Sequence, residues 1–225
     1  MSGRNAVFSR LRASLGVTGN EASRKAAVAE RLASAPKGVA APEQYLDRAA
    51  RVGLFIRNAE AVKATVSRVA TPAQVPAAVA EYLRQNDLPA MLRHGDDPRL
   101  KALPWRTTPQ LTLNAGKAQP EDLTGLSFAE AGVAESGSVM LASGQDNPTT
   151  LNFLPENHIV VLAASDLTGD YETGWEKLRA RHPGPLLPRA VNFITGPSRS
   201  ADIEQTIQFG AHGPRRLHII VIESA

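Results

Sequence analysis

Two clusters of small polar residues in the second half of the chain are the best candidates for chemistry. The first is AESGS at residues 134–138, and the second is TGPSRSADIE at residues 195–204. Each adjoins a short apolar run typical of a strand, and ligands of open α/β sheets gather where strands end. Glycine allows close backbone approach and serine adds a hydroxyl without bulk, so both clusters could bind an anion. The predicted ligand-binding residues are Ser136, Gly137, Ser138, Thr195, Gly196, Ser198, Arg199, Ser200, Asp202, Glu204, His212 and Gly213.

Arg199 and Glu135 are the charged candidates for binding and catalysis. The Arg199 guanidinium offers a planar fork of donors that could complete a phosphate or carboxylate clamp. In the alternative, the glycines and serines only make tight turns, and Arg199 pairs with Asp202 or Glu204. Glu135 is the catalytic candidate, as a general base or a nucleophilic carboxylate; otherwise it is a solvated loop carboxylate. The chain has neither a P-loop ending nor a GxGxxG fingerprint.

Histidine spacing argues against a metal site, and the lack of cysteine excludes redox chemistry on cysteine or on a cysteine-bound cluster in this chain. His212 could form a metal site with His158, Asp202 and Glu204, but no HExxH-like spacing supports one. His212 is more simply a turn hydrogen-bond donor, and His158 a satisfied histidine at the start of a strand. The chain has no cysteine, which excludes thiolate zinc sites, disulfides and cysteine-ligated iron–sulfur clusters held by it. We therefore predict no metal and no bound cofactor.

The elements that must position these residues alternate between strand and helix. The run HIVVLAA is apolar without interruption, as a strand buried on both faces should be. This alternation predicts an α/β domain with a largely parallel central sheet flanked by helices. We expect strands at 62–69, 88–92, 158–163, 190–195 and 217–222, and helices at 42–60, 71–83 and 171–181. A short apolar run at 139–141 follows the first cluster, and residues 96–120 show no clear pattern.

Residues 1–41 are predicted to be a basic helical extension that precedes the main domain at 42–225. Apolar residues recur at helical spacing within 5–15, and a second, alanine-rich helix is expected from Asn20 to Ser34. The apolar stripe could pack against the domain, dock a partner or support a homodimer. Aromatic residues for base stacking and a recognition-helix pattern are lacking, so we expect no nucleic-acid binding.

Charge and hydropathy indicate where the protein works. The chain has 225 residues, with 25 Lys and Arg against 22 Asp and Glu and 43% hydrophobic residues. A chain of this length buries roughly 70% of its extended surface, so it can form a substantial core. It has no apolar run of about 18 residues, so we expect no membrane span. Arg4, Arg10 and Arg12 interrupt the segment that an export signal would keep apolar, which predicts a cytoplasmic protein.

Three motifs carry a family resemblance. In chain order they are AESGS, then LPENHIVVL at 154–162, then ITGPSRSADIEQTIQFGAHGP at 194–214. They resemble the LUD-domain family of lactate-utilisation proteins, and in particular its small members without iron–sulfur clusters. The resemblance covers residue 45 to the C-terminus. The family tends to carry threonine at three serine positions here and a β-branched residue in place of Ala211; the hydroxyls are kept at Ser136, Ser138 and Ser200.

The resemblance implies a fold like that of ribose-phosphate isomerases, glucosamine-phosphate deaminases and CoA transferases. It also implies a non-redox role beside iron–sulfur partner proteins that oxidise L-lactate to pyruvate, and it brings no established catalytic residue. The second hypothesis is a stand-alone enzyme, resembling CoA transferases or sugar-phosphate isomerases, that acts on a small anionic molecule. The sequence Glu135-Ser136-Gly137 is similar to the turn that supplies the acyl-accepting carboxylate of CoA transferases.

Overall fold

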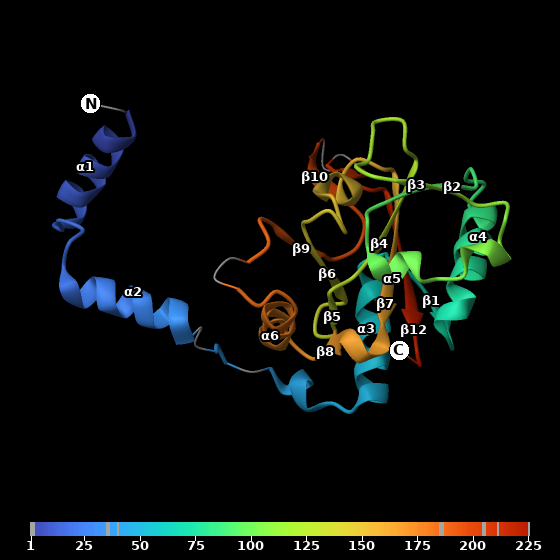
Figure 1. Ribbon diagram of the computed structural model, residues 1–225, viewed down its shortest axis with the longest axis horizontal. Helices are drawn as coiled ribbons and strands as arrows, with labels where there is room; N and C mark the ends of the chain where they lie inside the picture. The colour runs from blue at the N-terminus through green and yellow to red at the C-terminus, as the bar shows by residue number, and fades with distance from the viewer. Residues whose placement is uncertain are drawn as a thin grey trace. The chain divides into compact units, whose positions relative to one another are not determined.

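The protein is described by a computed structural model that covers residues 3–34, 37–39, 41–184, 187–203, 206–210 and 212–224 (Figure 1). The chain divides into two units, residues 1–39 and 40–225. The first unit contains α1 (Gly3–Leu15) and α2 (Ala22–Ser34), neither of which has a buried residue. Helix α2 begins after Glu21, whose carboxylate accepts the backbone N–H groups of Thr18 and Gly19. No helix among the described residues is long and apolar enough to cross a membrane.

A six-stranded parallel sheet forms the centre of the second unit. Its strands lie in the order β1 (Thr65–Val69), β12 (Arg216–Ile222), β7 (Asn157–Ala163), β4 (Thr124–Phe128), β2 (Met91–His94) and β3 (Thr112–Ala115). All seven residues of β7 are buried because the strand is covered on both faces. The predicted α/β class with a largely parallel central sheet is therefore confirmed.

Each face of the central sheet has its own apolar core. On one face, Leu126, Ile159 and Ile220 pack with residues of α4 (Val75–Gln85) and α5 (Pro98–Lys101). On the other face, Val160 and Ile219 pack with residues of α3 (Arg48–Ala61). Short 3-10 turns complete this part of the fold at η1 (Pro42–Tyr45), η2 (Pro72–Gln74), η3 (Trp105–Thr107), η4 (Thr149–Asn152) and η5 (Ala164–Asp166).

A second, mixed sheet lies beside α3. Its strand order is β8 (Leu167–Thr168), β5 (Ala131–Val133), β6 (Ser138–Ala142) and β9 (Val191–Ile194). Helix α6 (Tyr171–Arg181) covers it, so that α6, the second sheet, α3 with the central sheet, and α4 follow one another across the unit (Figure 1). Strands β10 (Arg199–Ile203) and β11 (Thr206–Phe209) form a separate hairpin.

Several predicted boundaries were wrong for local reasons. The helix expected at 42–60 is divided, because Asp47 caps a new helix by accepting the Ala50 N–H at 2.8 Å. The strand expected at 88–92 lies at Met91–His94, since Pro89 cannot donate to a sheet ladder. The strands with many small or polar residues were not predicted: β3, β4, β5, β8, β10 and β11.

Candidate functional site

The two predicted clusters meet at the edge between β6 and β9. These strands are antiparallel neighbours, with Val139 opposite Ile194, so the residue before one lies beside the residue after the other. Ser138 Oγ and Thr195 Oγ1 are 2.6 Å apart, and Ser136 Oγ lies 2.7 Å from Ser138 Oγ. The fold therefore joins residues that are far apart in the sequence into one group of hydroxyls.

Tyr171, the first residue of α6, completes this hydroxyl group. Its phenol donates to Ser136 Oγ at 2.8 Å and lies 3.0 Å from Ser138 Oγ. Ser138 is fully buried, so these contacts satisfy a hydroxyl that has no access to solvent. This role of Tyr171 could not be predicted, because nothing in the order of the residues shows that the start of α6 faces the turn after β5.

The glycines of the two clusters allow close contact with the C-terminal end of α3. Gly137 has φ +69°, and a Cβ atom there would lie 2.2 Å from the Ala59 backbone nitrogen. Gly196 has φ +82°, and its Cβ would lie 2.3 Å from the Val62 carbonyl oxygen. Only glycine fits both the left-handed backbone and the close approach. Both glycines therefore have a structural reason that does not involve a ligand.

Glu135 is half-buried and interacts with the start of a helix. Its Oε1 accepts the backbone N–H of Tyr171 at 3.0 Å. The neighbouring Asp170 caps the same helix by accepting the Thr173 N–H at 2.8 Å. A carboxylate is favourable at a helix N-terminus, where the unpaired N–H groups carry partial positive charge. The carboxylate of Glu135 is thus a helix-capping acceptor rather than a solvated loop group.

A cavity of about 200 Å³ lies next to the hydroxyl group. His158 and Leu217, which are paired near the amino ends of β7 and β12, line one side of it. Three of the predicted residues also line it: Thr195, Gly196 and Ser198. We expected the site at the carboxyl ends of sheet strands. The clusters do follow strands β5 and β9, but these belong to the second sheet, whose turns adjoin the amino ends of the central strands.

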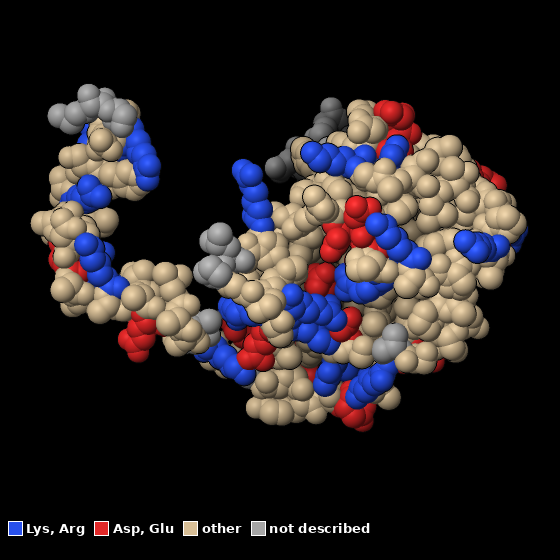
Figure 2. Space-filling view, in the orientation of Figure 1, with Lys and Arg blue, Asp and Glu red and all other residues tan. Residues whose placement is uncertain are grey.

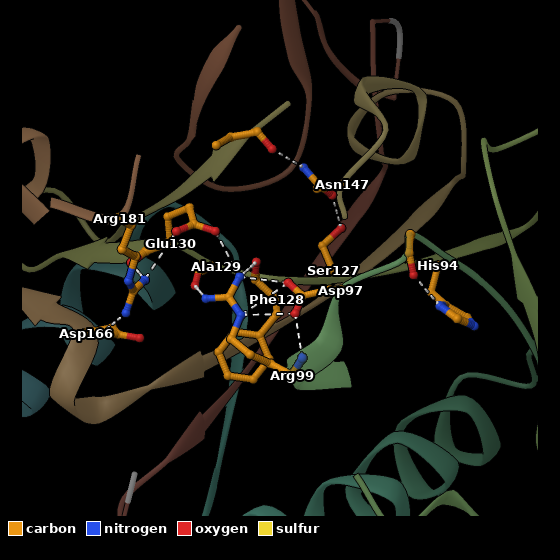
Figure 3. A network of polar contacts seen from close by, with 12 residues as sticks. His94, Asp97, Arg99, Ser127, Phe128, Ala129, Glu130, Asn147, Asp166 and Arg181 are labelled. Carbon is orange, nitrogen blue, oxygen red and sulfur yellow. Dashed lines mark hydrogen bonds and ion pairs between the residues drawn. The ribbon is translucent and has the colours of Figure 1, made fainter. Parts of the chain in front are cut away.

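His158 begins a chain of buried polar groups beside this cavity. Its Nε2 lies 2.9 Å from Ser127 Oγ, and Ser127 Oγ donates to Asn147 Oδ1 at 2.8 Å. Asn147 Nδ2 in turn donates to Asn152 Oδ1 at 3.3 Å. Burial lowers the pKa of His158 to about 4, so its imidazole is neutral at pH 7. Figure 3 shows Ser127 and Asn147 in contact. We call this chain the neutral network.

The segment that precedes β12 closes the cavity from the other side. The Ser198 N–H donates to the Pro214 carbonyl at 2.8 Å, and the His212 N–H donates to Ser198 Oγ at 3.2 Å. A Cβ at Gly213 would lie 3.5 Å from Ser198 Cβ, so this residue packs beside the same serine. His212 is exposed and serves here through its backbone.

Arg199 is not among the residues that line the cavity, although the preceding Ser198 is. It is exposed at the start of β10, and its backbone lies opposite Phe209 of the antiparallel strand β11. The side chains of Ser200 and Asp202, and all of Glu204, lie outside the described residues. The described residues hold no group of three or more His, Asp or Glu side chains that could bind a metal ion.

A second polar network, which the sequence did not indicate, lies beyond the carboxyl ends of the central strands. Arg99 donates from Nη2 to Asp97 Oδ2 at 2.7 Å and to Glu130 Oε1 at 2.9 Å, and its guanidinium stacks on the Phe128 ring (Figure 3). Arg181 bridges Glu130 and Asp166, and Lys177 also pairs with Asp166. We call this group the charged network. On the face of the larger unit seen in Figure 2, residues of both signs are intermingled.

The LUD domain family model matches residues 52–222. The chain belongs to the LUD domain family. Lactate utilization protein C of Geobacillus sp. strain WCH70 is 38% identical over 99 residues, which are 44% of this chain and 41% of the relative. Lactate utilization protein C of Halalkalibacterium halodurans is 39% identical over 108 residues, or 48% and 46% of the two chains. The chain thus matches less than half the length of these relatives.

A solved structure shows the same fold. The crystal structure of a DUF162 family protein from Deinococcus radiodurans superposes with a TM-score of 0.56 at 21% identity, and covers 79% of this chain and 99% of that one. The LUD domain of the present chain contains the hydroxyl group, the cavity and both polar networks, since all of them lie within residues 52–222. The family resemblance predicted from the three motifs is therefore confirmed.

Proposed function

We propose that this LUD domain protein acts in lactate utilisation, as a cytoplasmic component that holds no iron–sulfur cluster of its own. The main support is the family match over residues 52–222 together with the similarity to relatives named lactate utilization protein C. The absence of cysteine fits a division of labour in which partner proteins carry the iron–sulfur clusters that accept electrons from L-lactate. In this division, the present chain contributes binding or assembly.

The proposed ligand site is a pocket for a small anion where the two clusters meet. The 2.6 Å contact between Ser138 and Thr195 brings the predicted residues together, and the adjacent cavity offers space beside Thr195 and Ser198. Hydroxyl groups can donate to a carboxylate or phosphate oxygen without a formal positive charge. Arg199, which follows Ser198 in the chain, remains the candidate cation for this site.

The alternative, a stand-alone enzyme that forms an acyl intermediate on Glu135, has less support. A nucleophilic carboxylate needs an accessible oxygen, whereas Glu135 is half-buried and one of its oxygens binds the first N–H of α6. This contact explains the position of Glu135 without any catalytic role.

Growth on L-lactate tests the proposed function. We expect deletion of the coding sequence in its source organism to abolish growth on L-lactate but not on pyruvate, and expression of the full chain to restore it. A chain that lacks residues 1–36 should fold but no longer co-purify with its iron–sulfur partners or a second copy, because α1 exposes Phe8 and Leu11. Unchanged growth of the deletion strain on L-lactate would refute the proposal.

A further inference from the structure

A basic groove at the amino ends of β1 and β12, beside the last turn of α4, lies outside the site described above. Its volume is about 440 Å³, and among the described residues its lining shares only Leu217 with the cavity beside the hydroxyl group. Lys63, Arg215 and Arg216 line it, and none of its described lining residues is Asp or Glu. No ion pair joins any of these three cations to a carboxylate of the described residues. Cations that share a groove without a counter-charge attract an anion.

The two arginines of the groove are held in place by their surroundings. Arg216 Nη1 donates to Asn157 Oδ1 at 3.2 Å. The backbone N–H groups of Arg215 and Arg216 both donate to the Glu156 carbonyl, at 2.8 and 3.2 Å. Gly210, with φ +83°, makes room for the Arg215 side chain, because a Cβ there would lie 2.1 Å from Arg215 Cγ. Contacts of this kind restrict the two side chains before a ligand binds, which lowers the entropic cost of binding.

Lys63 has a backbone conformation that favours glycine. It is the first residue after the C-cap of α3 and has φ +73°. Glycine is the usual residue at this position because it adopts positive φ without strain, so a lysine there brings a charge at the cost of some backbone strain. Strands β1 and β12 are parallel, and Lys63 and Arg216 each lie two residues before the paired residues at 65 and 218. Both charges therefore lie at the same end of the two strands.

Tyr82 supplies a hydroxyl donor to the groove. It is 6% exposed and its ring stacks on His218, with the ring centroids 4.2 Å apart. The phenol makes no hydrogen bond to a described residue and its oxygen is not fully enclosed, so it faces the groove that Tyr82 lines. Burial raises the pKa of Tyr82, which the nearby charge of Arg216 only partly offsets, so the phenol keeps its proton at pH 7.

The other polar groups around this aromatic stack use their protons within the protein. Thr65 Oγ1 donates to the Leu217 carbonyl at 3.4 Å, so it must accept from His218 Nδ1–H at 2.8 Å. Burial lowers the pKa of His218 to about 4, so the imidazole is neutral at pH 7. Its Nε2 atom then accepts from Ser67 Oγ at 3.1 Å. The phenol of Tyr82 is therefore the hydroxyl donor that the described lining leaves for a ligand.

We propose that this groove binds the phosphate group of a small phosphorylated molecule, held by the three cations and the Tyr82 phenol. A phosphate monoester carries a charge of about −2 at pH 7 and offers several acceptor oxygens, whereas a monocarboxylate offers a single charge. Arginine can donate to phosphate oxygens through two parallel N–H groups. At about 30 Å³ for each non-hydrogen atom, 440 Å³ holds roughly fifteen such atoms, enough for the phosphate and a short organic body. The inference does not depend on the proposed function, because the groove and the cavity are separate sites.

Calorimetric titration of the unmodified full chain with inorganic phosphate tests the groove, with acetate at the same ionic strength as the comparison. We expect phosphate to bind at least about fivefold more tightly than acetate, because it carries the greater charge. Tyr82→Phe removes only the phenol oxygen and keeps the ring stack, and it should weaken phosphate binding about fivefold. Tyr45→Phe, at an exposed position outside the groove, is the matched control and should leave the affinity unchanged. Equal affinities for phosphate and acetate, or no binding of phosphate, would overturn the inference.

Lys63→Gly separates binding from folding. Glycine adopts φ +73° without strain, so the midpoint of thermal unfolding should not fall, while the affinity for phosphate should drop several-fold with the loss of one cation. Lys117→Ala removes an exposed lysine outside the groove and should leave the affinity unchanged. A Lys63→Gly chain that binds phosphate as tightly as the unsubstituted chain would refute the site. So would sedimentation with phosphatidylglycerol vesicles by a chain that does not bind free phosphate, which would assign the cations to a membrane surface.

Discussion

The charged and neutral networks beside the central sheet differ in how completely their polar groups are paired. In the charged network, Arg99 donates to two carboxylates and to the Ala129 carbonyl, and each of its carboxylates has at least one cationic partner. In the neutral network, His158 and Asn152 each keep one atom unpaired beside a cavity. The first network lies beyond the carboxyl ends of the strands, and the second reaches the amino end of β7.

The difference follows from the free energy of burial. An unpaired buried charge is too costly for a stable fold, so the charged groups occur with their partners. An unpaired neutral group costs only about 1–3 kcal/mol, which a ligand can recover on binding. Full pairing therefore marks the charged network as structural, although it is at the sheet edge where ligands usually bind. Incomplete pairing leaves the neutral network with polar atoms that carry no protein hydrogen bond among the described residues.

Removal of one charge from the charged network should have the largest effect. Asp97 is 2% exposed, accepts from the Arg99 side chain and also caps α5 by accepting the Arg99 N–H. We expect Asp97→Asn to lower the free energy of unfolding by about 3 kcal/mol, since it leaves a partly buried guanidinium without its main counter-charge. Urea unfolding measures this change.

The neighbouring Asp96 provides the control. It pairs with Lys101 at 2.9 Å, but both side chains are more than half exposed. Surface pairs of this kind contribute little, so Asp96→Asn should leave the unfolding midpoint unchanged. Similar shifts in the two variants would show that the charged network does not stabilise the fold through its buried pairs.

Mild acid should weaken the neutral network first. The pKa of His158 is lowered from 6.5 to about 4 by burial, so the unfolded chain binds a proton at a pH where the folded chain does not. The free energy of unfolding should therefore fall between pH 6.5 and 4, by about 3 kcal/mol for a shift of this size. His218, whose pKa burial also lowers to about 4, adds a loss of the same sign.

Asp166 of the charged network should resist acid over that range. Burial raises the pKa of Asp166, but hydrogen bonds from Arg181 and Lys177 outweigh burial and lower it below its usual 3.8. Its contribution is present above pH 3.8 and is lost only as the pH falls further. Urea unfolding at several pH values from 7 to 4.5 measures how steeply the free energy of unfolding falls with pH. This slope gives the number of protons taken up on unfolding, and His158→Asn should lower that number by up to one. A flat profile in the unsubstituted chain would contradict a neutral, buried His158.

A methyl group at Gly196, which lines the cavity beside the neutral network, should destabilise the fold. Gly196→Ala places a Cβ 2.3 Å from the Val62 carbonyl oxygen at φ +82°, so we expect a loss of about 2–3 kcal/mol in the free energy of unfolding. Gly116→Ala is the control, because Gly116 also has positive φ, +119°, but its Cβ would meet nothing within 4 Å. If both variants lose the same amount, contact with α3 is not what requires glycine at 196.

The sequence predicted the apolar framework and the residues of the hydroxyl group. Runs such as 158–163 and 217–222 are apolar enough to be buried on both faces, so their strands were found with the correct orientation in a parallel sheet. Ser136, Ser138 and Thr195 were identified because small polar residues stand next to such runs. Strand β5, with the sequence AGV, was not found because a three-residue strand lacks a detectable period.

The sequence could not predict either polar network. His158 was expected to be a satisfied histidine, but its Nδ1 atom has no partner among the described residues. The rest of the neutral network forms because Asn147 contacts Ser127 of β4 and also contacts Asn152. The charged network joins segments near residues 97, 130, 166 and 181, whose contact only the assembled sheets create. Pairing of this kind is a property of tertiary packing and has no local pattern.

Glu135→Gln should have the smallest effect and separates the two functional hypotheses. Gln keeps an oxygen that can accept the Tyr171 N–H, so only the interaction of the charge with the N-terminus of α6 is lost, about 0.5 kcal/mol. Glu172→Gln removes a charge from the same turn without that hydrogen bond and serves as the control. If Glu135 only caps the helix, both variants restore growth of the deletion strain on L-lactate. If Glu135 were an acyl-accepting nucleophile, Glu135→Gln alone would abolish that growth, because an amide cannot replace the attacking carboxylate.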